Sequence, residues 1–362
     1  MEHSFGTSAD FTVGIEEELL VVDKTSHDLA HASEPLLAAM DMDKRLARHD
    51  LYEAQIELSS PISRNAEEAT RSLGELRGRL RDAGGTVIGA GIHPAGRFGD
   101  VRIVDAERYA RESERLRGLV DRTPDCALHV HVGMPDPETA ILVCNGFREQ
   151  IPLLEALAGN SPFWFGRDSG FASARRFLRR GFPRVQIPAP FGSFAEYEDV
   201  VNAAVNAAEV DDYTFLWWEV RPHPKFGTVE VRTMDSQSSL GSVAGLAALV
   251  QGLAKHFAES PRGEPAPREV VAEASFRAGR DGVDATLPVG DSLRPVRQVA
   301  ADMLALVRPH ARELGSEAPL EEIERIVRDG NGAYRQRAAH GNGGMPAVLR
   351  RLVDETADRQ AW

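Results

Sequence analysis

Hydrophobic and polar residues alternate along the second half of the stretch Tyr213–Asp235, YTFLWWEVRPHPKFGTVEVRTMD. A period of two residues is typical of a strand with one buried face. The pattern predicts two extended segments, Tyr213–Val220 and Gly227–Met234, and the prolines and glycine between them predict a turn. The stretch is therefore expected to fold as a hairpin.

The second segment of this hairpin has one polar and one apolar face. Glu230 and Arg232 share the polar face, while Val229 and Val231 lie on the other. Taken alone, the pattern is equally compatible with an exposed hairpin that carries a cross-strand ion pair. Its recurrence elsewhere in the chain favours a functional site.

Three further segments repeat the alternation, each with one apolar face. They are Thr12–Asp23, Leu51–Ser59 and Ala127–Gly133. Their polar faces present residue types that bind metals, namely Glu16 and Glu18 in the first segment, Glu53, Gln55 and Glu57 in the second, and His129 and His131 in the third. If the four segments join one sheet, its polar face becomes a concave site of carboxylates, imidazoles and an arginine.

Simpler structural roles remain open for these residues. Two histidines on an isolated strand are more often structural than metal ligands. Likewise, the run Glu16–Glu18 alone would usually form a solvated edge.

The remaining pattern is mostly helical. Ser33 is expected to cap a helix that runs to about Arg48, and Asn65 to cap a long amphipathic helix that ends at Gly84. A further buried strand is predicted, as are helices in both halves of the chain. The strand is 86–92, and the helices are 105–121, 137–158, 240–257, 269–278, 293–314, 320–329 and 345–356.

The stretch Asn160–Phe191 is long, irregular and rich in arginine, aromatic residues, glycine and proline. Such a segment in a compact protein is usually a functional loop, so we expect a lid. One or two of its arginines are expected to contact carboxylate or phosphate groups, the candidates being Arg167, Arg175, Arg176, Arg179, Arg180 and Arg184.

The order of these elements predicts an α+β fold. Residues 11–235 supply the strands of a mainly antiparallel sheet, and residues 236–362 are mainly helical and pack on it. No clean linker separates the two parts, so residues 1–362 are expected to form a single catalytic domain.

Composition narrows the class of protein. The chain has 362 residues and a formal net charge of −13, which argues against nucleic-acid binding because phosphate contacts need clustered basic residues. No apolar run has membrane-spanning length and no signal peptide is recognisable, so a cytoplasmic protein is expected. Cys126 and Cys144 match no metal or redox spacing and are expected to be buried and reduced.

Several nucleotide and metal motifs are absent from the sequence. It contains no Walker A loop, no G-x-G-x-x-G after a strand, no H-E-x-x-H and no C-x-x-C. A protein of this composition that binds ATP must therefore hold the phosphates with Mg²⁺ and arginine. The polar face of the predicted sheet offers those groups.

Six sequence blocks together resemble the carboxylate–amine ligase family, also called glutamate–cysteine ligase type 2, which is distantly related to the classical bacterial enzyme. The blocks occur in the expected order between about residues 11 and 356. They are TVGIEEELLVVD, YEAQIELSSP, ALHVHVGMPD, NSPFWFGRDSGFAS, WWEVRPHPKFGTVEVRTMD and GAYRQRAA.

The resemblance implies a fold related to glutamine synthetase, in which a curved antiparallel sheet forms a funnel for Mg-ATP. Matched by motif, the residues that resemble the metal ligands are Glu16, Glu57, His129 and Glu230. Arg232 corresponds to the residue that steadies the transferring phosphoryl group. Asp50 is a candidate contact for the incoming amine or a metal, with the spacing to Glu57 that the classical ligases show. The implied cofactors are ATP and Mg²⁺, with Mn²⁺ as an alternative.

The resemblance also offers candidate contacts with substrate or nucleotide. They are Glu18, Glu53, His131, Arg335 and Arg337. His131 stands where the classical ligases usually carry asparagine. Strict alternation would also place Asp50 on the opposite face from Glu57, so Asp50 requires a bulge or a position just before the strand.

The implied reaction is ATP-dependent amide formation through an acyl phosphate, with glutamate as carboxylate and cysteine as amine. A metal-dependent hydrolase using His129 and His131, or a non-catalytic sensor of ATP or amino acids, would be alternatives on the same fold. Small-molecule substrates are the expected partners. The sequence does not fix the oligomeric state, and a homodimer is one alternative.

Overall fold

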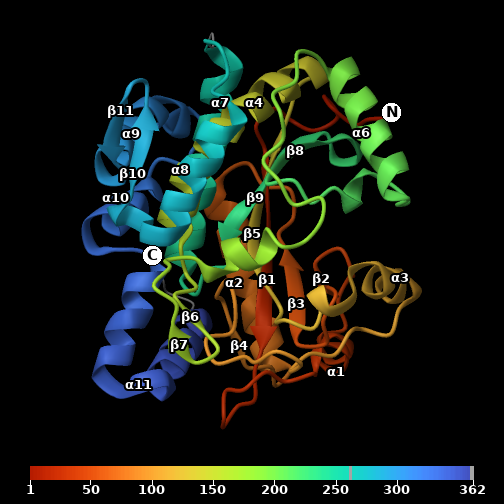
Figure 1. Cartoon of the computed structure of the whole chain (residues 1–362), viewed down its shortest axis with the longest axis vertical. Coiled ribbons are helices and arrows are strands. Elements are labelled where there is room, and N and C mark those ends of the chain that lie inside the picture. The colour runs from red at the N-terminus through yellow and green to blue at the C-terminus, as the bar shows by residue number, and fades with distance from the viewer. Residues whose placement is uncertain (261–262, 359–362) are drawn as a thin grey trace.

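A seven-stranded antiparallel sheet forms the centre of the computed structural model, which describes residues 1–260 and 263–358 (Figure 1). The strand order is β2-β3-β1-β5-β9-β8, and β4 pairs with β1. The predicted helical part, 236–362, includes residues 261–262 and 359–362, which lie outside the described residues. The strands of this sheet are β1 (Val13–Val21), β2 (Ala47–His49), β3 (Gln55–Ser59), β4 (Val87–Ile88), β5 (Ala127–Gly133), β8 (Val220–His223) and β9 (Thr228–Asp235).

The four alternating segments do join one sheet, as predicted. Two of the segments are shorter than predicted. β3 begins at Gln55, so residues 51–54 lie outside the strand. Tyr213–Phe215 forms a 3-10 turn, and β8 begins at Val220. A second 3-10 turn, Pro224–Phe226, and Gly227 at a φ of 66° then reverse the chain into β9. The left-handed conformation explains the glycine at this position.

The predicted strand 86–92 is wrong in length, since only Val87 and Ile88 pair. Gly89 lies so close to the chain at Gln237 that a Cβ atom there would sit 2.1 Å from the Gln237 carbonyl oxygen. The crossing chain therefore occupies the place where the ladder would continue.

The helix predicted to run from Ser33 to Arg48 is also too long. It ends at Met40, after which Asp41 adopts a left-handed conformation and its amide donates to the Leu37 carbonyl. Residues Ala47–His49 then form a strand beside β3. Arg48 is consequently a sheet residue, which matters for the site described below.

The other predicted helices are present, although the one expected at 345–356 begins at Gly332, and Asn65 caps its helix by accepting from the Glu68 amide at 2.9 Å. The helices Ala174–Arg179 and Phe194–Ala208 were not predicted. Residues 286–295, however, form a hairpin that the pattern did not predict. The helices are α1 (Ser33–Met40), α2 (Ala66–Asp82), α3 (Glu107–Leu116), α4 (Pro137–Ala158), α5 (Ala174–Arg179), α6 (Phe194–Ala208), α7 (Leu240–Glu259), α8 (Arg268–Asp281), α9 (Val296–Glu313), α10 (Leu320–Asp329) and α11 (Gly332–Ala357); two hairpins are β6 (Phe163–Trp164) with β7 (Arg167–Asp168), and β10 (Thr286–Val289) with β11 (Ser292–Pro295).

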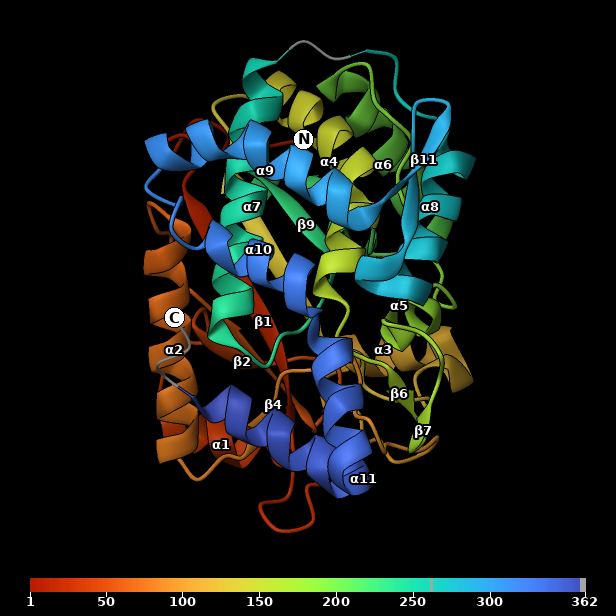
Figure 2. The same cartoon turned by 90° about the vertical axis from the view of Figure 1, so that its left-hand side faces the viewer.

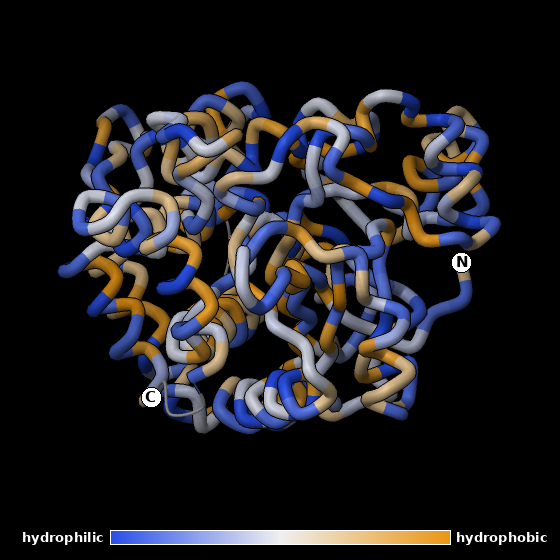
Figure 3. The backbone as a smooth tube through the Cα atoms, turned by 90° about the horizontal axis from the view of Figure 1, so that it is seen from below, coloured by the Kyte–Doolittle hydropathy of each residue, from blue (hydrophilic) through white to orange (hydrophobic). Residues whose placement is uncertain are grey.

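Helices α2, α4 and α7 pack on the sheet, and α9 and α10 lie outside α7 (Figure 2). The main hydrophobic cluster joins the apolar face of the sheet to these helices, including Ile15, Val130, Leu73, Leu154 and Leu246. Hydrophilic and hydrophobic residues alternate along the peripheral helices in Figure 3. Both cysteines are buried and free, as expected.

No helix within residues 1–260 and 263–358 is long and apolar enough to cross a membrane.

Glu17 departs from the solvated edge that a bare glutamate run would suggest. It lies on the apolar face of β1 with no exposed side-chain surface and pairs with Arg77 of α2 at 2.6 Å. Arg77 also donates to the carbonyls of Gln237 and Ser238 at 2.8 and 2.7 Å. One guanidinium thus ties the sheet, α2 and the chain leaving β9 together.

Replacing Arg77 with methionine is expected to lower the free energy of unfolding by about 3–5 kcal/mol, because Glu17 is left buried without its charge partner. Arg71→Met is the matched control on the same helix, since its pair with Glu67 is exposed and should contribute under about 0.5 kcal/mol. Urea unfolding of both variants measures the difference. Equal effects would show that the buried pair does not stabilise the fold.

Candidate active site

Three rows of cross-strand neighbours place the polar side chains on the face of the sheet opposite α2, α4 and α7. Glu57 lies between Arg48 of β2 and Glu18 of β1. Glu16 is opposite His129 on β5, and Glu230 lies between His131 of β5 and Arg221 of β8. These rows line a cavity of about 360 Å³.

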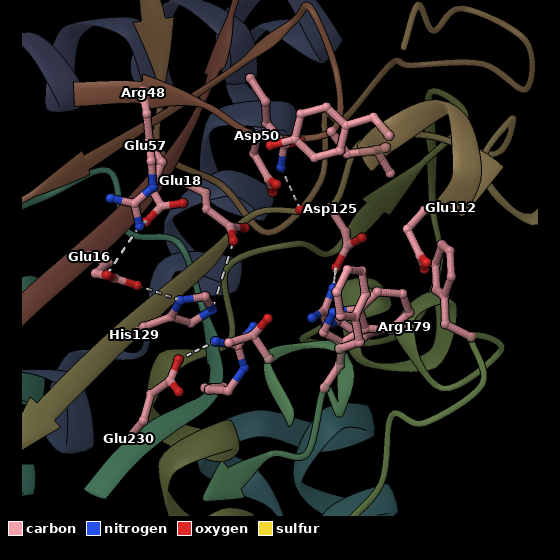
Figure 4. Close-up of a pocket in the computed structure, with 18 of the residues that line it drawn as sticks. Glu16, Glu18, Arg48, Asp50, Glu57, Glu112, Asp125, His129, Arg179 and Glu230 are labelled. Atoms are coloured by element: carbon pink, nitrogen blue, oxygen red, sulfur yellow. Dashed lines mark hydrogen bonds and ion pairs between the residues drawn. The ribbon is translucent and has the colours of Figure 1, made fainter. Parts of the chain in front are cut away.

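Glu16, His129 and Glu230 come closest to one another. One ligand atom from each lies within 4.8 Å of the others. The Nδ1 atom of His129 is 3.4 Å from Glu16 Oε2, and its Nε2 atom is 3.8 Å from Glu18 Oε1. Figure 4 shows the His129 ring between these two carboxylates. We call Glu16, His129 and Glu230 the acidic cluster.

His131 lies beside the acidic cluster. Its Nδ1 atom is 2.9 Å from Thr228 Oγ1, and its Nε2 atom is 3.7 Å from both Glu16 Oε2 and Glu230 Oε1. The buried Nε2 atoms of His129 and His131 have no hydrogen-bond partner among the described residues. Both therefore point an unpaired nitrogen toward carboxylates at more than hydrogen-bond distance.

Glu57 lines the same cavity but contacts Arg48, which also reaches Glu16 Oε1 at 3.2 Å (Figure 4). Asp50 follows β2 directly and lines the cavity from the turn between β2 and β3. The expected conflict with strand alternation does not arise, because Asp50 and Glu57 belong to different segments.

The carboxyl groups of the cavity strongly influence one another's ionisation. Burial raises the pKa of Glu57 well above its ordinary value, and the charge of Glu16 adds to the shift. Burial and the charge of Asp50 raise the pKa of Glu18 to about 8, and burial raises the pKa of Asp50. A cation held among these carboxylates would offset their repulsion.

His129 and Glu230 have the ionisation states of metal ligands. Burial, reinforced by Arg232, lowers the pKa of His129 to about 3, so its imidazole is neutral at neutral pH. Burial alone would raise the pKa of Glu230, but Arg221 and Arg232 outweigh it and hold the pKa well below its ordinary value. Carboxylate oxygens and a neutral imidazole together fit Mg²⁺ or Mn²⁺.

Arg232 contacts Glu230, while its buried Nε atom has no hydrogen-bond partner among the described residues. The register between β5 and β9 shifts here, since Val130 pairs with Val231 but Leu128 pairs with Met234. A bulge of this kind re-aims side chains. Arg232, next to this bulge, lies in the cavity wall with Glu230.

Three of the candidates that the family resemblance supplied lie away from the cavity. The backbone of Glu53 bonds to Ser33 and Arg102, and its side chain is not among the cavity's lining residues. Arg335 pairs with Glu355 at 3.4 Å and Arg337 with Asp168 at 2.8 Å. The structure does not bring these three residues to the other candidates.

Several lining residues were not singled out from the sequence. Arg221 donates to Glu230 Oε2 at 2.7 Å and to the Leu216 carbonyl at 2.8 Å. His223 lines the wall and stacks on Phe226 with ring centroids 4.2 Å apart. The alternation that revealed Glu230 would also have revealed Arg221 and His223 once β8 was placed correctly.

The sequence model of glutamate–cysteine ligase family 2 (GCS2) matches residues 12–355. The chain belongs to glutamate–cysteine ligase family 2. This confirms the resemblance read from the six blocks. A curated relative in Rubrobacter xylanophilus, provisionally named glutamate–cysteine ligase 2-1, is 38% identical over 354 residues and the match covers 95% of this chain and 94% of the relative.

Solved structures confirm the mixed fold of helices and antiparallel sheet. Glutamate–cysteine ligase from Francisella tularensis, in complex with AMP, superposes with a TM-score of 0.72 at 14% identity, covering 98% of this chain and 91% of that one. A bifunctional glutathione synthetase from Pasteurella multocida gives a TM-score of 0.66 at 16% identity, covering 96% and 51%.

Proposed function

We propose that this member of glutamate–cysteine ligase family 2 is an ATP-dependent ligase that joins the side-chain carboxylate of glutamate to an amine, with cysteine as the expected amine. The observation that carries the proposal is the acidic cluster, Glu16, His129 and Glu230, with Arg232 beside it in one cavity. In a chain of this family, the arrangement provides groups for binding nucleotide phosphates and a substrate carboxylate.

We assign Mg²⁺ to the acidic cluster, with Glu57 as a further carboxylate ligand once Arg48 turns away from it. Glu16, His129 and Glu230 would hold the ion, and the chemistry that it would supply there is positive charge against the phosphate oxygens of ATP. His129 supplies a neutral nitrogen, and Glu230 is fixed in position by Arg221. His131 supports the same cluster from the neighbouring position on β5.

Arg232 and Asp50 act on the reacting groups in this proposal. Arg232 donates to the equatorial oxygens of the phosphoryl group, where preorganised donors stabilise developing charge. The substrate carboxylate takes the γ-phosphoryl group to form an acyl phosphate and ADP. Asp50 accepts a hydrogen bond from the incoming amine, which displaces phosphate and forms the amide. Glu18 lines the same cavity and accepts a hydrogen bond from the Ala127 amide at 2.7 Å.

Exclusion of water is needed while the acyl phosphate exists. We propose that the sheet curves as a funnel around the cavity and that part of the segment Asn160–Phe191 covers it. Arg179 and Phe182 of that segment already line the cavity. The cytoplasmic location and the homodimer remain predictions.

ADP release tests the proposed function. Purified protein with ATP and Mg²⁺ is expected to release ADP only when glutamate and one amine are both present, across a panel of amino acids and amines given singly and with glutamate. Removing the metal with EDTA should stop release, and added Mg²⁺ should restore it. Catalysis without ATP would favour the hydrolase alternative, and ATP binding without release under any pairing would favour a sensor.

A further inference from the structure

A second charged group, Arg179 with Asp125, lies across the cavity from the acidic cluster. Figure 4 shows the two residues on the opposite side from Arg48, Glu16 and Glu57. Both line the cavity. Arg179 comes from α5, and Asp125 precedes β5, so this group is built from segments outside the rows that form the acidic cluster.

The contacts of Asp125 fix the position of this pair. Its Oδ2 atom lies 3.1 Å from Arg179 Nη1 and 3.6 Å from Arg175 Nε. Arg175 is only 1% exposed and also donates to the Thr233 carbonyl. Because Arg175 and Arg179 are one helical turn apart on α5, both approach Asp125 from the same side, and of the two only Arg179 lines the cavity.

The two sides of the cavity differ in how their arginines are used. Arg48 and Arg232 contact the carboxylates Glu57 and Glu230, and Arg221 holds Glu230 from β8. The contact of Arg179 with Asp125 uses Nη1, so Nη2 of the same planar fork can still donate to a ligand carboxylate. Asp125 uses Oδ2 for both arginines, so its Oδ1 atom can accept from an ammonium group.

A guanidinium beside a carboxylate complements the α-carboxylate and α-ammonium of an amino acid. An amino acid held this way points its side chain away from Arg179 and toward the acidic cluster. Only a side-chain carboxylate would then reach the phosphoryl group. The arrangement therefore explains why an α-amino acid would react at its side-chain carboxylate rather than at its α-carboxylate.

We propose that Arg179 binds the α-carboxylate, and Asp125 the α-ammonium group, of the dicarboxylic amino acid whose side-chain carboxylate is joined to the amine. This assignment rests on the proposed ligase function and adds the residues that select the substrate and direct the reaction to its side chain. Arg179 is a specificity-determining residue that contacts the substrate away from the reacting atoms.

The test compares glutamate with 4-aminobutyrate, which is glutamate without its α-carboxylate. In Arg179→Gln, kcat/KM for glutamate is expected to fall about 10- to 100-fold, the effect of losing a charged hydrogen-bond pair, and chiefly through KM. The value for 4-aminobutyrate should stay unchanged. Where 4-aminobutyrate turns over too slowly to detect, its inhibition constant against glutamate replaces kcat/KM.

Arg167→Gln is the matched control, because Arg167 lies exposed on β7 in the same segment; it should change neither value. If Arg179→Gln does not fold, Arg179→Lys carries the comparison and should show the same selective loss, smaller in size. An equal loss for both compounds would overturn the assignment and leave Arg179 with a structural role. Absence of glutamate-dependent ADP release in the unmodified protein would instead overturn the proposed function on which the assignment depends.

Discussion

Glu230→Gln is expected to abolish ligase turnover, lowering kcat by about a thousandfold or more, because the loss of a charged metal ligand removes several kcal/mol from transition-state stabilisation. Glutamine has nearly the same shape but carries no charge, so the acidic cluster loses one of its two carboxylates. The measurement is ADP release with ATP, Mg²⁺, glutamate and the accepted amine. Mn²⁺ titration followed by electron paramagnetic resonance should show weaker metal binding in the same variant.

The fold should survive this substitution. Arg221 also donates to the carbonyls of Tyr213, Thr214 and Leu216, so β8 stays anchored when its pair with Glu230 is weakened. Glu355→Gln is a suitable control, because Glu355 likewise pairs with two arginines, Arg335 and Arg351, but lies outside the cavity. Retained turnover and unchanged Mn²⁺ binding in Glu230→Gln would remove Glu230 from the metal site.

The alternation of residue types predicted the central sheet because a period of two separates its faces directly. Glu16, His129 and Glu230 could be assigned to one face from the sequence alone. The sequence could not show that these three side chains lie close together. That depends on β1, β5 and β9 being neighbours in the sheet, an order that differs from the order along the chain. The family resemblance supplied that step, because it relates the segments to a known arrangement.

The positions of residues that depend on long-range contacts could not be predicted from the sequence pattern. Arg48 was assigned to a helix, although a left-handed turn at Asp41 and pairing with β3 make it a strand residue. Alternation places Glu17 on the opposite face from Glu16 and Glu18, but its buried partner Arg77 could not be predicted from the sequence. Arg179 was one of six candidate arginines, and only the position of α5 against Asp125 distinguishes it from the others.

The bulge in β9 is a further feature that alternation does not predict. Strict alternation places Arg232 on the same face as Glu230, and it does not reveal the register shift that lies opposite His129. The Nε atom of Arg232 is buried with no hydrogen-bond partner among the described residues, an arrangement that costs free energy in the protein alone. A phosphoryl oxygen would satisfy such a donor.

Arg232→Lys is therefore expected to lower kcat by about 100- to 1000-fold, the range found when one preorganised donor to a developing charge is lost. Lysine keeps the positive charge beside Glu230, but an ammonium group cannot present two donors in the fixed plane of a guanidinium. The KM for glutamate should change little, because Arg232 is proposed to act on the phosphoryl group. Steady-state measurements with glutamate varied at saturating ATP separate these two constants.

Arg337→Lys is the control for Arg232→Lys, because it makes the same change from arginine to lysine at a position outside the cavity. Arg337 was a candidate for contacting nucleotide phosphates, yet it pairs with Asp168 on β7 and does not line the cavity. Its substitution should leave kcat unchanged. If Arg232→Lys retained full turnover, a point charge at that position would be sufficient, and the proposed donation to the phosphoryl oxygens would be wrong. If both variants lost turnover, the nucleotide would have to extend from the acidic cluster to α11, which the present cavity does not reach.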